Sequence, residues 1–201
     1  MESREPYLHA SADVADSAVI GSGSKVWHYA QIREAATLGL NCIVGRGAYI
    51  GSGVVVGDNC KIQNYALVYE PARLGDGVFV GPAVVFTNDQ FPRAINRDGS
   101  PKLASDWTPV GVTVGQGASI GAMSVCVAPV TIGAWAMIGS GSTVIRDVPD
   151  FALVVGNPAR RVGWVGKSGF RLLEVADGVW ACPVSGDRYR QIAPDTLIEM
   201  E

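Results

Sequence analysis

Charged residues are scarce in this chain of 201 residues, and no long apolar run is present. Lysine and arginine number 16 and aspartate and glutamate 19, so the net charge is −3 and only 17% of residues are charged. So little charge argues against a general role in binding nucleic acid or membranes. The first seven residues lack the charged and apolar regions of a cleavable leader, and no apolar run approaches the roughly 18 residues of a membrane span. We therefore expect a cytoplasmic protein.

Histidine and cysteine are also few. The two histidines, His9 and His28, cannot supply a three-histidine zinc site within one chain, and their spacing is not a short ligand motif. The C-terminal tail from Gly163 to Glu201 contains one cysteine, Cys182, and one cysteine cannot build a four-cysteine zinc site. We therefore expect no metal.

What the sequence has in abundance is a six-residue repeat. Beginning at Val14, an apolar residue recurs every six residues as far as Phe86, and the pattern resumes from Val114 to Val144. The fifth residue of each unit is small or β-branched, and glycine often follows the apolar residue. An amphipathic helix would repeat near 3.6 residues and an exposed strand near 2, so neither fits. Hexapeptide repeats indicate a parallel β-helix.

Three units of six residues make one triangular coil, and each coil pairs its strands with the next, about 4.8 Å away. No single unit can bury its apolar residue alone, so stacking supplies the core. Cys42 and Cys60 occupy fifth positions 18 residues apart. We interpret them as small core residues on adjacent coils of a protein in a reducing compartment, rather than as a disulfide or metal pair.

The chain is predicted to have three parts. Residues 1–13 form an N-terminal lead-in, and residues 14–150 form the β-helix, interrupted by a loop at 89–107. Residues 151–201 form an exit segment and a C-terminal β extension, which we expect to be a metal-free hairpin packed on the coils or on a neighbouring subunit. Loops that interrupt solenoids lie at a corner and often carry the function.

The 18-residue coil places the third residue of each turn in columns along the corners of the prism. Three columns follow from the numbering: His28, Arg46, Asn64 and Pro82; Glu34, Ser52, Glu70 and Asn88; Ser22, Leu40, Asp58 and Asp76. The first two are rich in hydrogen-bond donors and acceptors, which suits a substrate with a phosphate and several hydroxyls. Outward corner positions are also polar in proteins that bind nothing there.

Asn88 stands where the repeat breaks, and Glu70 should lie one coil before it. A carboxylate and an amide together can orient an amine nucleophile and hold its developing positive charge. Asp89 could accept a proton. Alternatively, Asn88 and Asp89 simply turn the chain out of the coil. His28 could act as a general base, but we favour a contact with substrate or with a neighbouring subunit.

Several strings between Val14 and Trp164 resemble one family. They occupy residues 26–34, 61–64, 68–70, 77–82, 86–94 and 156–164. The chain resembles the left-handed β-helix N-acetyltransferases that modify the 3-amino group of nucleotide-linked sugars. The resemblance implies a left-handed coil, a homotrimer with active sites between subunits, acetyl-CoA as cosubstrate, and a UDP- or dTDP-linked amino sugar as acceptor.

The resemblance also implies roles for particular residues. The amine would attack the thioester directly, with Asn88 orienting it and Glu70 also contacting the sugar nucleotide. Together with the reasoning above, this makes Asn88, Glu70 and Asp89 the catalytic candidates. The residues expected to contact the sugar nucleotide are His28, Gln31, Arg33, Asn64 and Arg93. The residues expected to bind acetyl-CoA are Gly121, Ala122, Gly139, Ser140, Asn157, Pro158, Arg160 and Arg161. Arginine suits phosphate groups because its fork of donors matches their geometry.

Two alternatives stay open. The scaffold could serve another acyl acceptor, such as serine, or another acyl donor. It could also be a non-catalytic trimeric scaffold, although such a protein would not need Glu70 and Asn88 beside a long corner loop. The nucleotide base and the identity of the sugar are left undecided by the residues.

Overall fold

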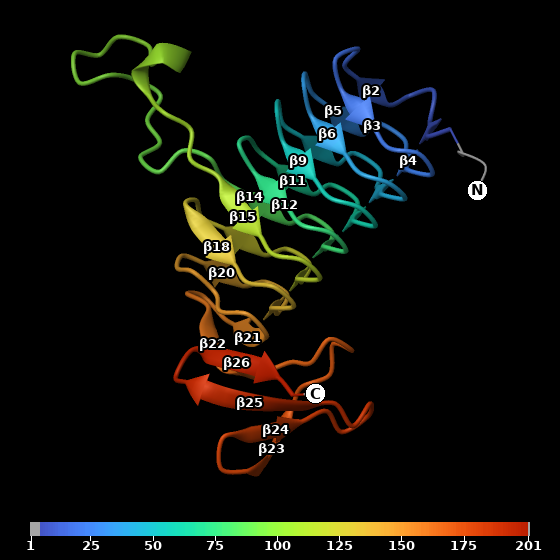
Figure 1. The fold of residues 1–201 in the computed structure, drawn as a ribbon. Coiled ribbons are helices and arrows are strands. Elements are labelled where there is room, and N and C mark those ends of the chain that lie inside the picture. The colour runs from blue at the N-terminus through green and yellow to red at the C-terminus, as the bar shows by residue number, and fades with distance from the viewer. Residues whose placement is uncertain (1–4, 201) are drawn as a thin grey trace.

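The structure is a computed structural model that describes residues 5–200. Its main body is a stack of triangular coils with the N-terminus at one end and a small sheet at the other (Figure 1). One loop projects away from the stack between β14 and β15. Between residues 5 and 200, no helix has the length and apolar character required to cross a membrane.

Three sheets form the sides of the prism. Sheet A contains, in spatial order, β1 (Tyr7–Leu8), β4 (Lys25–Val26), β7 (Ile43–Val44), β10 (Lys61–Ile62), β13 (Phe79–Val80), β16 (Ser119–Ile120), β19 (Met137–Ile138), β21 (Ala152–Val155) and β22 (Arg160–Trp164). Sheet B contains β2 (Asp13–Val14), β5 (Gln31–Ile32), β8 (Tyr49–Ile50), β11 (Leu67–Val68), β14 (Val85–Phe86), β17 (Val125–Cys126) and β20 (Thr143–Val144). Sheet C contains β3 (Val19–Ile20), β6 (Thr37–Leu38), β9 (Val55–Val56), β12 (Arg73–Leu74), β15 (Val112–Val114) and β18 (Val130–Ile132).

The register between coils is the 18-residue spacing that the sequence predicts. In sheet B, Leu67 pairs with Val85 in a parallel ladder. Across the loop the spacing changes to 40 residues, because Arg73 pairs with Thr113, yet the ladder remains parallel. The loop is therefore inserted at a corner without disturbing the stack, and the predicted left-handed parallel β-helix is confirmed.

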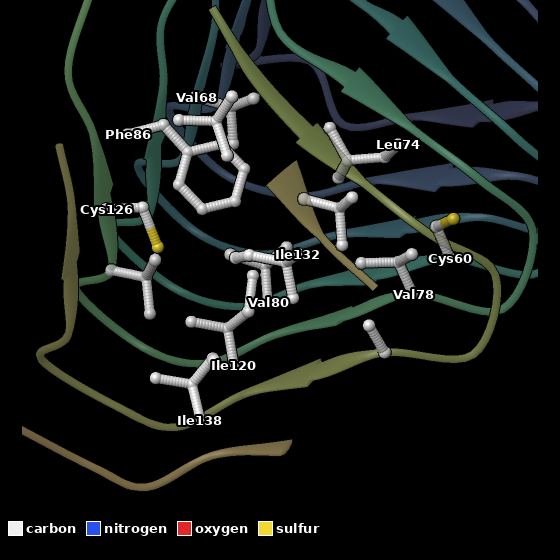
Figure 2. Packing of buried hydrophobic residues seen from close by; sticks show 14 of the residues in the cluster. Cys60, Val68, Leu74, Val78, Val80, Phe86, Ile120, Cys126, Ile132 and Ile138 are labelled. Atoms are coloured by element: carbon white, nitrogen blue, oxygen red, sulfur yellow. The ribbon is translucent and has the colours of Figure 1, made fainter. Parts of the chain in front are cut away.

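The core lies inside the prism and consists of the residues that repeat every six positions (Figure 2). Val80 and Phe86 are fully buried, and so is Cys60 at a fifth position. Burial of Cys126 raises the pKa of its thiol to about 12, as expected for an inert core residue. All four cysteines are free and buried, so the interpretation of Cys42 and Cys60 as core residues is confirmed.

The two ends of the prism are built differently. At the N-terminal end, β1 lies within the segment predicted as a lead-in, and Tyr7 pairs with Lys25 of the next coil. At the C-terminal end, β22 pairs antiparallel with β21 and leads into the extension. A solenoid end exposes its core unless something covers it, and the extension supplies that cover.

The extension is a four-stranded antiparallel sheet rather than a single hairpin. Its strands are β23 (Leu173–Ala176), β24 (Val179–Ala181), β25 (Arg188–Ala193) and β26 (Thr196–Glu199). Tyr189 is fully buried and its ring lies 5.3 Å from that of Phe151. Cys182 Sγ lies 3.3 Å from Ser168 Oγ, so the only cysteine of the extension contacts a hydroxyl. The extension therefore packs on the coils, which is one of the two arrangements predicted above, the other being packing on a neighbouring subunit.

Candidate functional site

The three sheets meet at corners that we name A/B, B/C and C/A, in the order in which the chain passes through them. At the C/A corner, acidic side chains in the third turn position fold back onto the preceding coil. Asp58 Oδ1 accepts a hydrogen bond from the Leu40 amide at 2.7 Å, and Asp76 Oδ1 accepts one from the Asp58 amide at 2.8 Å. These carboxylates satisfy backbone donors that the turn would otherwise leave unpaired. We call this arrangement a corner clamp.

Asn64, which the sequence predicts as a substrate contact, forms such a clamp at the A/B corner. Its Oδ1 accepts a hydrogen bond from the Arg46 amide at 2.9 Å. The side-chain carbonyl is therefore used within the coil stack. Its side-chain NH2 group donates no hydrogen bond to any residue between 5 and 200. Only this NH2 group is therefore free to bind a ligand.

The B/C corner contains the predicted catalytic residues, and there the pattern differs. Glu70 occupies the third turn position, but its Oε2 atom is buried and has no hydrogen-bond partner among residues 5–200. A buried carboxylate oxygen without a donor is costly. Nearby, the rings of Tyr49 and Tyr69 lie 5.0 Å apart. Burial, followed by the charge of Glu70, raises the pKa of Tyr49.

Asn88 lies one coil beyond Glu70 at the same corner. The pairing of Val68 with Phe86 places the two residues that follow each of them in equivalent turn positions, so Glu70 and Asn88 occupy neighbouring rungs of one edge. The Asn88 carbonyl accepts a hydrogen bond from the Val110 amide at 2.9 Å, which closes the base of the 89–107 loop. Its side-chain amide forms no hydrogen bond within the described part of the chain.

Asp89, the third predicted catalytic residue, has partners for both carboxylate oxygens. Oδ1 accepts a hydrogen bond from the Phe91 amide at 2.8 Å, and Oδ2 lies 3.6 Å from Lys102 Nζ. The contact with Lys102 anchors the start of the 89–107 loop to its returning segment. Both contacts favour a structural task over the proton transfer that the sequence suggested.

The predicted substrate contacts do not converge within one chain. His28 lies at the A/B corner, where its ring stacks on that of His9 with centroids 3.5 Å apart. Arg33 lies at the B/C corner, 3.9 Å from Asp13 and 2.9 Å from Glu34 in two ion pairs. Gln31 is exposed on the outer face of β5, and Arg93 is exposed in the 89–107 loop. His28 and Arg33 are therefore separated by the width of sheet B.

The predicted acetyl-CoA residues follow the late coils of the A/B corner. The Gly141 amide donates to the Ala122 carbonyl at 2.8 Å, which stacks the two turns that contain Gly121 and Ser140. Gly139, Asn157 and Pro158 continue the same corner toward β22. These turns offer backbone groups and little side-chain bulk, which is what a ligand lying along the corner requires.

The two predicted arginines lie at the end of the prism. A pocket of ≈ 180 Å³ there is lined by Arg146, Arg160, Arg161 and Asp195, among others. The Arg161 guanidinium lies 4.2 Å from the Trp164 ring centroid and 3.3 Å from Asp195. Both arginines are exposed, but Arg161 is partly committed to the extension, whereas Arg160 donates to the Ala159 carbonyl. The sequence did not single out Arg146, whose place beside Arg160 arises from the fold.

The repeats match two family models. Residues 53–88 match the bacterial transferase hexapeptide (six repeats), and residues 36–65 and 111–146 match the hexapeptide repeat of succinyl-transferase. A solved structure of LpxA, a UDP-N-acetylglucosamine acyltransferase from Bacteroides fragilis, shares the fold with a TM-score of 0.64 at 18% identity, over 80% of this chain and 62% of that one. Parts of the chain therefore match hexapeptide-repeat models, and the whole shares the fold of this solved structure.

Three curated relatives share parts of the sequence. The dTDP-3-amino-3,6-dideoxy-alpha-D-galactopyranose 3-N-acetyltransferase of Aneurinibacillus thermoaerophilus is 62% identical over 52 residues, which cover 26% of this chain and 27% of that protein. Serine acetyltransferase 4 of Arabidopsis thaliana is 36% identical over 90 residues (44% and 24%). The bifunctional protein GlmU of Jannaschia sp. is 32% identical over 165 residues (76% and 33%). The matched stretches thus span a third or less of these relatives.

Proposed function

We propose that this protein is an acetyl-CoA-dependent N-acetyltransferase that acetylates the 3-amino group of a nucleotide-linked sugar. One observation carries the proposal: at the foot of a long corner loop, a buried oxygen of Glu70 lies one rung from the side-chain amide of Asn88, and neither has a hydrogen-bond partner among residues 5–200. The relative from Aneurinibacillus, which is named for this reaction on a dTDP-linked sugar, supports the choice of acceptor.

The chemistry follows from these two side chains. The neutral amine attacks the carbonyl carbon of the thioester, a C–N bond forms, the C–S bond breaks, and the proton lost by nitrogen ends on the CoA sulfur. Nitrogen becomes positive as it attacks, so the Glu70 carboxylate stabilises the transition state more than the ground state. The Asn88 amide accepts a hydrogen bond from the amine and fixes its direction of approach. No side-chain base is required.

The active site is proposed to lie between subunits of a trimer in the cytoplasm. His28 and the proposed acetyl-CoA turns share the A/B corner, whereas Glu70 and Asn88 lie at the B/C corner, across sheet B. A neighbouring subunit that presents its A/B corner to this B/C corner would bring the two sets together. The exposed Arg93 in the 89–107 loop would then face the same cleft.

A second candidate is O-acetylation of a hydroxyl acceptor, which the similarity to serine acetyltransferase 4 supports. The two candidates differ in the acceptor atom, and Glu70 discriminates between them. A hydroxyl needs a base to remove its proton, while a neutral amine needs a carboxylate to hold its developing charge. Asp89, beside Asn88, is anchored to Lys102 and the Phe91 amide, which leaves Glu70 as the carboxylate whose role differs between the two candidates.

The test is the release of free thiol from acetyl-CoA with different acceptors. We expect turnover with a UDP- or dTDP-linked 3-amino sugar, and none with serine or with the matching 3-hydroxy sugar nucleotide. Comparing the uridine and thymidine forms identifies the base. A protein that forms trimers but releases no thiol with any amino-sugar nucleotide would instead be a scaffold.

A further inference from the structure

Two glutamates occupy the third turn position of the B/C corner, and their side chains point in opposite directions. Glu34 points outward: its carboxylate accepts hydrogen bonds from Ser52 Oγ at 3.1 Å and from Arg33 Nη2 at 2.9 Å, and its side chain is 55% exposed. Its own backbone amide and then the Ser52 hydroxyl lower the pKa of this carboxyl. Glu70, two coils later, buries its Oε2 without a partner.

The residue beneath each glutamate explains the difference. Ala15 lies under Glu34, and Gly51 lies under Glu70, in each case 19 residues earlier. At Gly51 a Cβ atom would overlap Glu70 Oε2 and lie 2.7 Å from the Glu70 amide nitrogen. The carboxylate of Glu70 thus fills the space that a side chain at position 51 would occupy.

The corner clamps follow the same rule. A glycine lies beneath each clamping oxygen, and a Cβ atom there would meet that oxygen: Gly39 beneath Asp58, Gly45 beneath Asn64, Gly57 beneath Asp76 and Gly133 beneath Asp150. All four clamps accept a backbone N–H bond, the last from Ala134 at 2.7 Å. Glu70 shares the glycine but, with one more methylene, leaves its oxygen without a donor.

From this we infer that Gly51 is a positioning residue of the active site, because its missing side chain holds the Glu70 carboxylate inward with one oxygen unpaired. Gly51 does not adopt the left-handed conformation, so its own backbone angles do not require glycine; the close approach of the Glu70 amide nitrogen and carboxylate does. The inference rests on the proposed function only for its catalytic consequence. That Gly51 determines the position of the Glu70 carboxylate does not depend on the proposed function.

The test compares Gly51→Ala with Gly57→Ala. The two changes are matched, since a Cβ atom at position 57 would overlap Asp76 Oδ1 and lie 2.8 Å from the Asp76 amide nitrogen. We expect similar losses of thermal stability in both. Turnover should fall roughly 10- to 100-fold only in Gly51→Ala, with the acceptor KM little changed. A Gly51→Ala enzyme with wild-type turnover would overturn the inference.

A stability cycle tests the placement without any activity. In the wild-type background, Glu70→Ala removes a buried unpaired oxygen, so the melting temperature should rise. In the Gly51→Ala background the carboxylate already points outward, and the same change should have no effect. Additive changes across the cycle would overturn the inference. If the wild type transfers no acetyl group, the proposed function fails while this cycle still decides the role of Gly51.

Glu70→Asp provides the same test if Gly51→Ala does not fold. The shorter side chain should reach the Ser52 amide, as Asp58 reaches that of Leu40 at 2.7 Å. We expect lower turnover together with equal or higher stability. An aspartate enzyme with unchanged turnover would show that an inward, unpaired carboxylate is not needed at this position.

Discussion

The C/A and B/C corners of this prism share the same turn, but the acidic side chains in it have different hydrogen-bond partners. At the C/A corner, Asp58 and Asp76 fold over glycines and accept backbone hydrogen bonds from the coil before. At the B/C corner, Glu70 folds over Gly51, but its Oε2 finds no donor in the described part of the chain. One extra methylene thus separates a carboxylate that holds the coils together from one whose buried oxygen has no donor among residues 5–200.

The comparison shows that polarity alone is a poor sign of a site in a solenoid. Both corners carry carboxylates in the third turn position, and two of these, Asp58 and Asp76, serve the backbone. The informative feature is a polar group that the fold buries and does not satisfy. The predictions below test this distinction, beginning with the largest expected effect.

The B/C corner should lose activity without losing stability. Asn88→Ala removes a side-chain amide that has no partner among residues 5–200 but keeps the backbone bond from Val110. We expect turnover to fall by roughly one to three powers of ten, with a change in unfolding free energy within about 0.5 kcal/mol. Steady-state kinetics and urea denaturation measure the two. Wild-type turnover would remove Asn88 from the mechanism and abolish the contrast.

The C/A corner should behave in the opposite way. Asp58→Ala deprives the Leu40 amide of its acceptor at 2.7 Å. We expect a loss of about 1–2 kcal/mol in the free energy of unfolding and unchanged turnover. Urea denaturation at neutral pH provides the measurement. The distinction between the corners would break if this variant were as stable as the wild type but inactive.

His28 sharpens the comparison by adding the A/B corner. If it contacts the acceptor, His28→Ala should raise the acceptor KM by roughly tenfold, the equivalent of about 1.4 kcal/mol, and leave kcat nearly unchanged. His9→Ala is the matched control, because the His9 ring stacks on that of His28 with centroids 3.5 Å apart and His9 is not a predicted substrate contact. A normal KM with lost kcat would instead make His28 a proton-transfer group.

The smallest effect concerns the 89–107 loop, which includes the short helix η1 (Ala104–Asp106). Hydrogen bonds from the Asn96 side chain and then from the Leu103 amide lower the pKa of Asp106 in the folded loop. A carboxyl with a lowered folded pKa stabilises the loop fully above its unfolded pKa, near 4, and this contribution is lost as pH falls through the lower value.

We therefore expect the loop around Leu103 to loosen below about pH 4. The Leu103 amide chemical shift, followed by NMR between acidic and neutral pH, is the measurement. Asp106→Asn should remove the step, because it no longer titrates. A step that persists in this variant would assign the transition to another carboxyl. In that case, the hydrogen bonds to Asp106 would not stabilise the loop as those to Asp58 and Asp76 stabilise the prism.

The coil, its register and the insertion point of the loop could all be predicted from residue order. Period six leaves few ways to bury Val80 and Phe86 together, and the pairing of Val68 with Phe86 follows directly from it. The juxtaposition of Glu70 and Asn88 is a consequence of that register. The C-terminal extension was less accessible, since its four strands have no repeat and its docking depends on the contact of Tyr189 with Phe151.

The sequence by itself determined where each side chain stands along the prism, because a strict period ties residue number to height and corner. Which polar side chains are satisfied was decided only in three dimensions. Asn64 and Asp89 were expected at the site, yet both have partners within the fold, whereas one Glu70 oxygen has none. That outcome depends on side-chain length measured against the backbone of another coil, and no linear pattern records it.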